Sequence, residues 1–146
     1  MIPYQLRPYT KADFDFVYQA KKEAYQSYVE KFWGVWDEEK QRSFFNDFIQ
    51  KVQGALSIIE YNGAPIGLYH GDMMNQETYE IGNIIVIPEY QGKGIGTDIL
   101  FKVIQKYPKI KMHLQVFKGN PAIHLYQRLG FVIADETRTH AIMERE

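Results

Sequence analysis

Apolar side chains along the chain follow two periods, and each period predicts a different kind of element. Spacings of three and four residues are typical of helices that bury one face. They occur in four segments, at residues 14–32, 44–52, 95–107 and 120–131. Stretches rich in β-branched and aromatic residues predict strands. They lie at residues 4–10, 55–61, 64–74, 78–87, 111–117 and 131–145, and the last is long enough for a hairpin of two strands.

Residues that begin helices and turns support these boundaries. Thr10 and Asp13 form a T-x-x-D cap before the first helix, and Asn120 caps the last one. The dipeptide Asn62–Gly63 predicts a tight hairpin. The resulting order is β-α-α-β-β-β-α-β-α-β-β. It predicts an α/β fold in a single domain, residues 1–146, with a central mixed, largely antiparallel sheet of about seven strands flanked by about four helices.

Composition and charge exclude several classes of protein. The net charge is −1, from 17 basic and 18 acidic residues, which argues against a protein that grips nucleic acid through its phosphates. No cysteine occurs, so disulfides, thiolate metal sites and a cysteine nucleophile are excluded. The four histidines lack metal-ligand spacing, and we expect no metal. The amino terminus lacks a signal-peptide pattern and no apolar run reaches about 18 residues, so we expect a cytoplasmic protein without membrane association.

Three glycines crowd into five positions between a predicted strand and a predicted helix, at Gly92, Gly94 and Gly96. Bare backbone there exposes the N–H groups of the helix's first turn, where the helix dipole is positive. Such a loop cradles phosphate oxygens, and Lys93 adds a charge. The stretch fits neither the P-loop pattern G-x-x-x-x-G-K-[ST] nor the dinucleotide pattern G-x-G-x-x-G. A turn that merely eases packing is the alternative.

The remaining pattern, Q-x-x-G-x-G at Gln91, Gly94 and Gly96, follows a strand that ends V-I-P-E-Y. This combination resembles the acetyl-CoA loop of the GNAT superfamily of N-acetyltransferases. A second segment, NPAIHLYQRLGF at residues 120–131, is similar to the family's later N-x-x-x-x-x-Y and G-F stretch. The element order matches along nearly the whole chain. The resemblance implies the GNAT fold and acetyl-CoA as the acyl donor.

Cofactor-binding residues follow from the resemblance, position by position. The strand at 84–87 is expected to splay from the strand at 112–117, so that the pantetheine arm inserts between them. The family's binding positions correspond here to Ile85, Val86 and Ile87, whose backbone bonds pantetheine; to Gln91, Gly92, Lys93, Gly94, Ile95, Gly96 and Thr97 around the pyrophosphate; and to Asn120, Ala122 and Tyr126 beside the arm.

Two catalytic roles are implied. Tyr126 matches the family's frequent general acid, which protonates the departing thiolate; the alternative is that its ring only packs against the sheet. Glu80 lies where many members place the general base that deprotonates the acceptor ammonium. It is equally a strand residue facing solvent. His113 and His140 are alternative bases, because imidazole titrates near neutral pH.

The acceptor side is less defined by the sequence. In the family the first two helices and their loop border the acceptor, and here the predicted loop holds Trp33 and Trp36 before the acidic run at 37–39. Aromatic faces beside carboxylates suit an amine. Asn83 is a polar strand residue that would orient substrate or water. Alternatively Tyr25, Tyr28 and Phe32, which share one helical face, are simply core residues, and Asp37 only caps the next helix.

The implied activity is transfer of acetyl from acetyl-CoA to a primary amine of a small molecule or peptide. Without cysteine there is no cysteine-bound acyl-enzyme, so direct attack in a ternary complex is favoured. A catalytically silent acyl-CoA sensor of the same fold is the alternative function. Another acyl-CoA as donor, and a monomer or a homodimer, all remain open.

Overall fold

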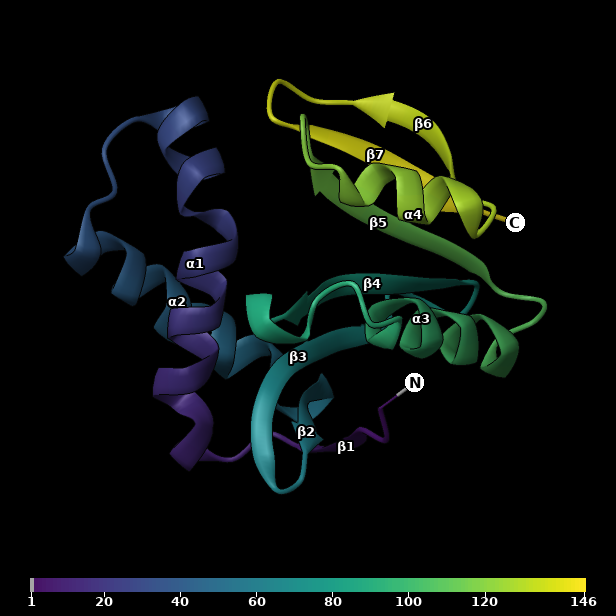
Figure 1. Cartoon of the computed structure of the whole chain (residues 1–146). Coiled ribbons are helices and arrows are strands. Elements are labelled where there is room, and N and C mark those ends of the chain that lie inside the picture. The colour runs from purple at the N-terminus through teal and green to yellow at the C-terminus, as the bar shows by residue number, and fades with distance from the viewer. Residues whose placement is uncertain (1) are drawn as a thin grey trace. The chain divides into compact units, whose positions relative to one another are not determined.

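The computed structural model describes residues 2–146 and contains seven strands and four α-helices in the predicted order (Figure 1). The strands are β1 (Gln5–Pro8), β2 (Leu56–Tyr61), β3 (Ala64–Met73), β4 (Thr78–Val86), β5 (Lys111–Phe117), β6 (Val132–Glu136) and β7 (His140–Arg145). The helices are α1 (Phe14–Trp33), α2 (Glu38–Val52), α3 (Ile95–Lys106) and α4 (Ala122–Arg128), with short 3-10 turns η1 (Lys11–Asp13), η2 (Gln53–Ala55) and η3 (Pro88–Tyr90).

The strands form one mixed sheet in the order β1-β2-β3-β4-β5-β7-β6. The parallel pair is β4 with β5, whereas β1 with β2, β2 with β3, β5 with β7 and β6 with β7 are antiparallel. The predicted α/β class, element order and largely antiparallel sheet are therefore confirmed. By its contacts the chain divides into two compact units. Unit 1 contains the residues up to His70 together with Asn83–Ile95, and unit 2 contains Gly71–Gly82 and Gly96–Glu146.

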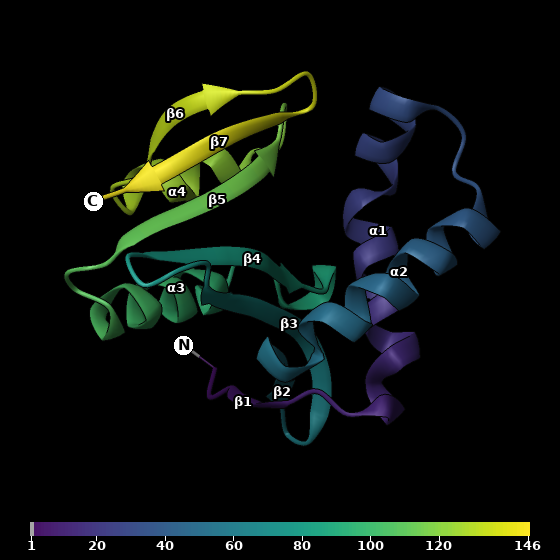
Figure 2. The same cartoon turned by 180° about the vertical axis from the view of Figure 1, so that it is seen from behind.

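In unit 1, α1 and α2 pack together and against the strands (Figures 1 and 2). The buried cluster between them is aromatic and aliphatic, and its members are Tyr9, Val17, Tyr18, Ala20, Phe45, Ile49, Leu56, Ile58, Leu68 and Ile85. Rings of the two helices meet edge to face, with 4.9 Å between the centroids of Phe14 and Phe45. Phe44, the first residue of the helical segment predicted at 44–52, is instead 57% exposed, and α2 begins six residues earlier, at Glu38.

Local sequence explains where α1 and α2 begin and end. The Asp13 carboxylate accepts the backbone N–H of Thr10 at 2.8 Å, as the predicted cap requires. Helix α1 then continues through Trp33 and stops at Gly34. The φ of Gly34 is 101°, a backbone angle that residues with a side chain rarely adopt. The sequence predicts Trp33 in the connecting loop, and that placement is wrong by one residue. Asp37 caps α2 by accepting the N–H of Lys40 at 3.1 Å.

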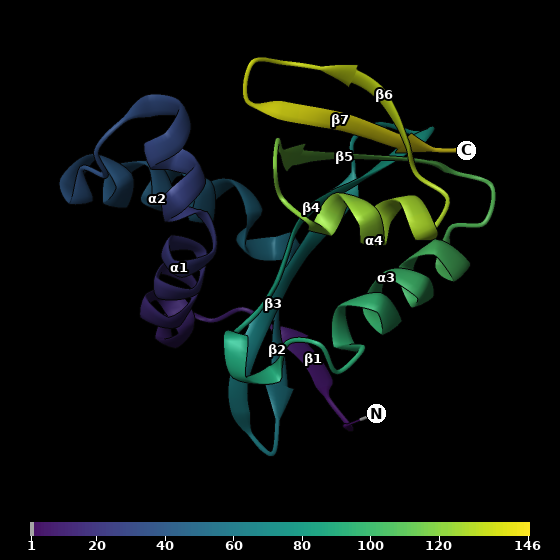
Figure 3. The same ribbon diagram turned by 45° about the horizontal axis from the view of Figure 1, so that its top comes forward.

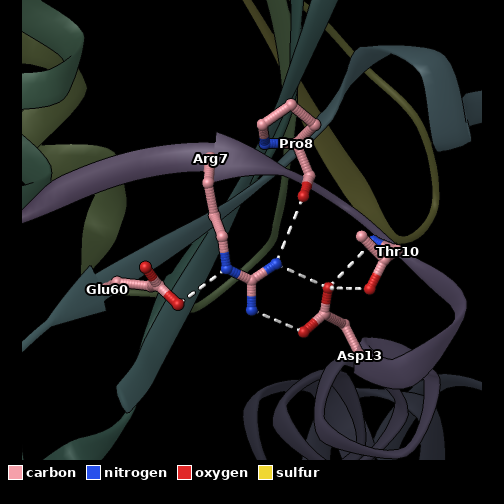
Figure 4. Close-up of polar contacts among 5 residues, drawn as sticks. All are labelled: Arg7, Pro8, Thr10, Asp13 and Glu60. Carbon is pink, nitrogen blue, oxygen red and sulfur yellow. Dashed lines mark hydrogen bonds and ion pairs between the residues drawn. The ribbon is translucent and has the colours of Figure 1, made fainter. Parts of the chain in front are cut away.

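An ion network fastens the first strand of unit 1 (Figure 4). The Arg7 guanidinium donates to both carboxylate oxygens of Asp13 at 2.7 Å and to Glu60 at 2.6 Å. It thereby joins β1, η1 and β2. The bidentate hydrogen bond from Arg7 lowers the pKa of the Asp13 carboxyl despite the burial of that group.

Strand β3 approaches β4 very closely at Gly67. A Cβ atom built on Gly67 would overlap the carbonyl oxygen of Ile85 and lie 3.1 Å from the Cα of Val86. Only glycine permits this approach without displacing a strand. The predicted turn between β2 and β3 is confirmed, since Asn62 and Gly63 both have positive φ, 52° and 76°.

In unit 2, α3 and α4 cover one face of β5, and β7 lies along its edge (Figure 3). Met112, Leu114 and Val116 are buried on the covered face. Helix α4 begins with the Asn120 side chain accepting the N–H of Ala122 at 2.9 Å, so the predicted cap is confirmed. It ends at Gly130, whose φ is 98°.

Candidate functional site

The glycine loop joins η3 of unit 1 to α3. Gly92 and Gly94 adopt φ values of 74° and 82°, so the backbone itself requires glycine at both positions. Residues 91–94 are exposed to solvent, and the chain turns inward again at Ile95, which is 1% exposed. The loop therefore presents bare backbone to solvent directly before a helix of 12 residues. This arrangement has the chemistry of an anion site, because the first N–H groups of a helix lack partners within the helix and the helix dipole is positive there.

The end of β4 has one edge turned toward β3 and one turned away. The N–H of Ile87 donates to Ile66 of β3 at 2.9 Å, and the carbonyl of Ile85 points toward Gly67. Because backbone groups alternate along a strand, those of Val86 face the other edge. There the side-chain amide of Gln91 donates to the Val86 carbonyl at 2.7 Å. Of the three residues predicted to bond pantetheine, Val86 is thus the one whose backbone polar groups face away from β3.

The second motif lies in unit 2. Tyr126 is 9% exposed, and its ring meets Phe131 edge to face with 6.1 Å between centroids. The N–H of Phe131 donates to the Tyr126 carbonyl at 3.0 Å, which closes the end of α4. Tyr126 therefore packs within unit 2, and its acid role stays a prediction. The Ala122 N–H donates to the Asn120 side chain at the start of α4, which gives both residues a structural role. Their contact with the pantetheine arm stays a prediction.

Glu80 and His113 are cross-strand partners in the parallel register of β4 and β5. The Nδ1 atom of His113 lies 3.5 Å from Oε2 of Glu80. The Glu80 side chain is 37% exposed, so its carboxylate reaches solvent and also lies beside His113. The third candidate base, His140, stacks on Phe117 at 4.3 Å, and its Nδ1 lies 2.7 Å from the Thr139 hydroxyl. Burial lowers the pKa of His140, which favours the neutral imidazole.

Among the expected acceptor residues, Asn83 donates to the hydroxyl of Tyr25 at 3.1 Å, which ties β4 to α1. Burial raises the pKa of the Tyr25 phenol. Trp36 packs against the unit 1 cluster, and its indole N–H donates to Glu38 at 2.7 Å. Hydrogen bonds from Lys22 and then from Trp36 lower the pKa of Glu38 to about 2. Trp36 thus has a packing role, whereas Trp33 is 57% exposed and suits a wall for a ligand.

Two residues of unit 1 escaped the sequence interpretation. Gly67 carried a visible signal, because an isolated glycine within a strand pattern indicates close backbone approach. Lys21 carried none, since lysine on a helix is ordinarily solvated. Its Nζ atom lies 3.4 Å from the centroid of the Phe48 ring, and burial lowers its pKa to about 8.

Similarity to known proteins bears on this site. The sequence model of the acetyltransferase (GNAT) family matches residues 15–131. An uncharacterized N-acetyltransferase of Methanocaldococcus jannaschii is 28% identical over 88% of this chain and 60% of its own length. The spermidine N(1)-acetyltransferase of Escherichia coli K12 is 30% identical over 90% of this chain and 74% of its own. The chain thus spans less than two thirds of the first relative.

A solved structure shares the fold. The PaiA N-acetyltransferase of Thermoplasma acidophilum in complex with coenzyme A superposes with a TM-score of 0.73, at 18% identity over 99% of each chain. The family match extends over four fifths of the sequence and through residues of both units. This chain therefore belongs to the acetyltransferase (GNAT) family.

Two kinds of feature are absent from residues 2–146. Their acidic and histidine side chains form no cluster of three or more that could hold a metal ion. Their helices include none that is both long and apolar enough to cross a membrane.

Proposed function

We propose that this chain binds acetyl-CoA and transfers its acetyl group to a primary amine of a small molecule or peptide by direct attack in a ternary complex. One observation carries the proposal. In a chain of the GNAT family, the loop before α3 is exposed and holds two glycines with positive φ at the motif positions. Its amides are the groups that a pyrophosphate would bind.

The donor is held by backbone more than by side chains in this proposal. Gln91 to Thr97 bind the pyrophosphate, and Val86 offers its N–H and carbonyl to pantetheine in the manner of an added strand. The Gln91 amide already occupies the Val86 carbonyl, so it mimics an arm amide and yields to it on binding. Asn120 and Ala122 contact the arm through the start of α4.

The chemistry requires one base and one acid. Glu80 takes a proton from the acceptor ammonium, and the freed amine attacks the thioester carbonyl to give a tetrahedral intermediate. Collapse of that intermediate breaks the carbon–sulfur bond, and the extra proton on its nitrogen leaves to solvent. The phenol of Tyr126 protonates the departing thiolate. A free phenol has a pKa of about 10 and a free thiol one of about 8.5. This transfer is uphill unless the phenol is held close to the sulfur.

The acceptor is proposed as a primary amine that lies beside α1 and α2, with Trp33 as a wall. Polyamines are the first class to test, because the E. coli relative is a spermidine acetyltransferase. Peptide amino termini are the second class. We further propose a cytoplasmic protein that acts as a monomer or a homodimer without a metal, a membrane or a nucleic acid as partner.

A silent acyl-CoA sensor and a different acyl donor are the competing functions. The test is release of free thiol from acetyl-CoA, propionyl-CoA and succinyl-CoA in the presence of spermidine, of single amino acids and of short peptides. Mass spectrometry of the acceptor identifies the product. Acetylated amine with acetyl-CoA supports the proposal. Saturable acyl-CoA binding without product from any amine supports the sensor instead.

A further inference from the structure

Three adjacent strands of unit 2 carry polar side chains at one level of the sheet. Glu80 of β4 is the register partner of His113 on β5, and His113 is in turn the partner of Glu144 on β7. Residues directly opposite in neighbouring strands project to the same face. Their neighbours along β5, Met112 and Leu114, are buried on the other face. The row therefore lies on the face of β5 that α3 and α4 leave uncovered.

The two carboxylates of this row differ in their partners. The Glu144 carboxylate pairs with the Lys111 ammonium at 3.1 Å, so its charge is compensated. Glu80 instead lies near His113, with 3.5 Å between Nδ1 of His113 and Oε2 of Glu80. Nδ1 of His113 is buried and makes no hydrogen bond to the residues that the structure describes. A buried donor without a bond is unfavourable, and a shift of about half an ångström toward Glu80 would satisfy it.

We propose that His113 is a positioning residue for Glu80: its Nδ1–H donates to the Glu80 carboxylate when substrate is bound and fixes one oxygen toward the acceptor amine. This inference rests on the base role proposed for Glu80. The His113 side chain is 15% exposed and the Glu80 side chain is 37% exposed. The more buried imidazole can therefore hold the more exposed carboxylate in one orientation. Hydrogen bonds of catalytic groups are often long before substrate binds and shorten in the complex.

The proton balance is simple. The N–H bond of the acceptor ammonium breaks, and an O–H bond forms on the Glu80 oxygen that does not face His113. His113 keeps its own proton throughout. Glu144 and Lys111 are the other charged groups that face His113, and they neutralise each other.

The test compares His113→Leu with His113→Asn, whose amide can replace the Nδ1 donor, using acetyl-CoA and spermidine. In His113→Leu we expect kcat to fall about tenfold and KM for acetyl-CoA to stay unchanged. His113→Asn should recover most of kcat. In a Glu80→Gln background, His113→Leu should have no further effect. Equal losses in both His113 variants, or a full loss in the Glu80→Gln background, would overturn the inference.

Two readouts separate this inference from the proposed function. If Glu80→Gln retains the kcat of the parent protein, Glu80 is not the base and the positioning role falls with it, whereas the proposed acetyl transfer stands. If Glu80→Gln is impaired and His113→Leu is not, only the positioning role falls. Should no amine be acetylated, nuclear magnetic resonance of the His113 ring still decides the pairing. The ring resonances of His113 should differ between the parent and Glu80→Gln, and unchanged resonances would refute the contact.

Discussion

Gly67 of β3 and Ile85 of β4 touch backbone to backbone, with no room for a methyl group between them. This contact fixes the end of β4, because Ile87 pairs with Ile66 immediately beside it. The Val86 backbone is consequently turned toward the other edge, where the proposed cofactor binds. A residue without a side chain on one strand thus determines which backbone groups the next strand presents.

Replacing Gly67 by alanine should therefore disturb both stability and cofactor binding. Overpacking of this kind typically costs about 1–3 kcal/mol, and we expect a loss of that size in urea unfolding. Affinity for acetyl-CoA should fall as well, because the Val86 edge shifts. Gly54→Ala is the matched control, since a Cβ there meets nothing within 4 Å. Gly67→Ala with parental stability and affinity would show that the strands separate freely.

Lys21 should make the free energy of unfolding depend on pH in an unusual window. Its pKa is about 8 in the folded protein and 10.5 as a free side chain. Between these values the unfolded chain binds more protons, so stability rises with pH. The gap corresponds to about 3 kcal/mol, which the contact with Phe48 partly offsets.

Lys21→Met should accordingly stabilise the protein most below pH 8, with the gain fading toward pH 10.5. Chemical unfolding at several pH values measures it. Lys22→Met is the control, because Lys22 is paired with Glu38 at 3.0 Å. A gain that does not vary with pH, or the same gain in both variants, would mean that the Lys21 ammonium is well solvated.

Asp13 should stabilise unit 1 through its ionised carboxylate. Asp13→Asn weakens both hydrogen bonds from Arg7, and we expect a loss of about 2 kcal/mol at neutral pH. Because the folded pKa is lowered, the contribution is present above the unfolded value and is lost as pH falls through the folded one. The difference between parent and variant should therefore shrink in acid. Exposed Asp15→Asn serves as control, and an equal loss there would contradict a specific role for Arg7.

Tyr126→Phe should lower kcat at least tenfold while leaving acetyl-CoA affinity within about twofold. The ring and its contact with Phe131 remain, so only the phenol is removed. Tyr107→Phe, in a ring stacked at 4.7 Å on Tyr79, controls for removal of a phenol elsewhere in unit 2. Steady-state kinetics across a pH series is the measurement. Parental kcat at every pH would assign the proton to solvent or to another donor.

Features that depend on a few neighbouring residues were predictable from the sequence. The Asn62–Gly63 hairpin, the Asp37 and Asn120 caps and the glycine loop each follow from backbone preferences at the site itself. The element order followed because apolar periods of 3.6 and 2 differ clearly.

Features that depend on distant segments were not predictable. Trp36 is a tryptophan, a residue type that also lines ligand sites, yet here it packs against the buried cluster of unit 1. The contact of the Lys21 ammonium with a ring depends on Phe48, which lies on another helix. The pairing of Glu80 with His113 depends on the register between two strands. Periodicity says which residues share a face of one element, not which element lies opposite. For the same reason the sequence proposed Glu80 and His113 as rival bases, whereas the fold makes them neighbours.

The central claim is that the bare backbone around Gly94 binds the pyrophosphate of acetyl-CoA. Calorimetric titration of the protein with acetyl-CoA and with acetyl-pantetheine, which lacks that group, tests it most directly. Gly94→Ala and Gly63→Ala both place a side chain at positive φ, 82° and 76°, but only the first lies in the loop. We predict saturable acetyl-CoA binding that weakens at least about tenfold with acetyl-pantetheine and with Gly94→Ala, but not with Gly63→Ala. Equal affinity for both ligands, or no binding of acetyl-CoA or other acyl-CoAs, would contradict the claim and leave the glycines a structural role.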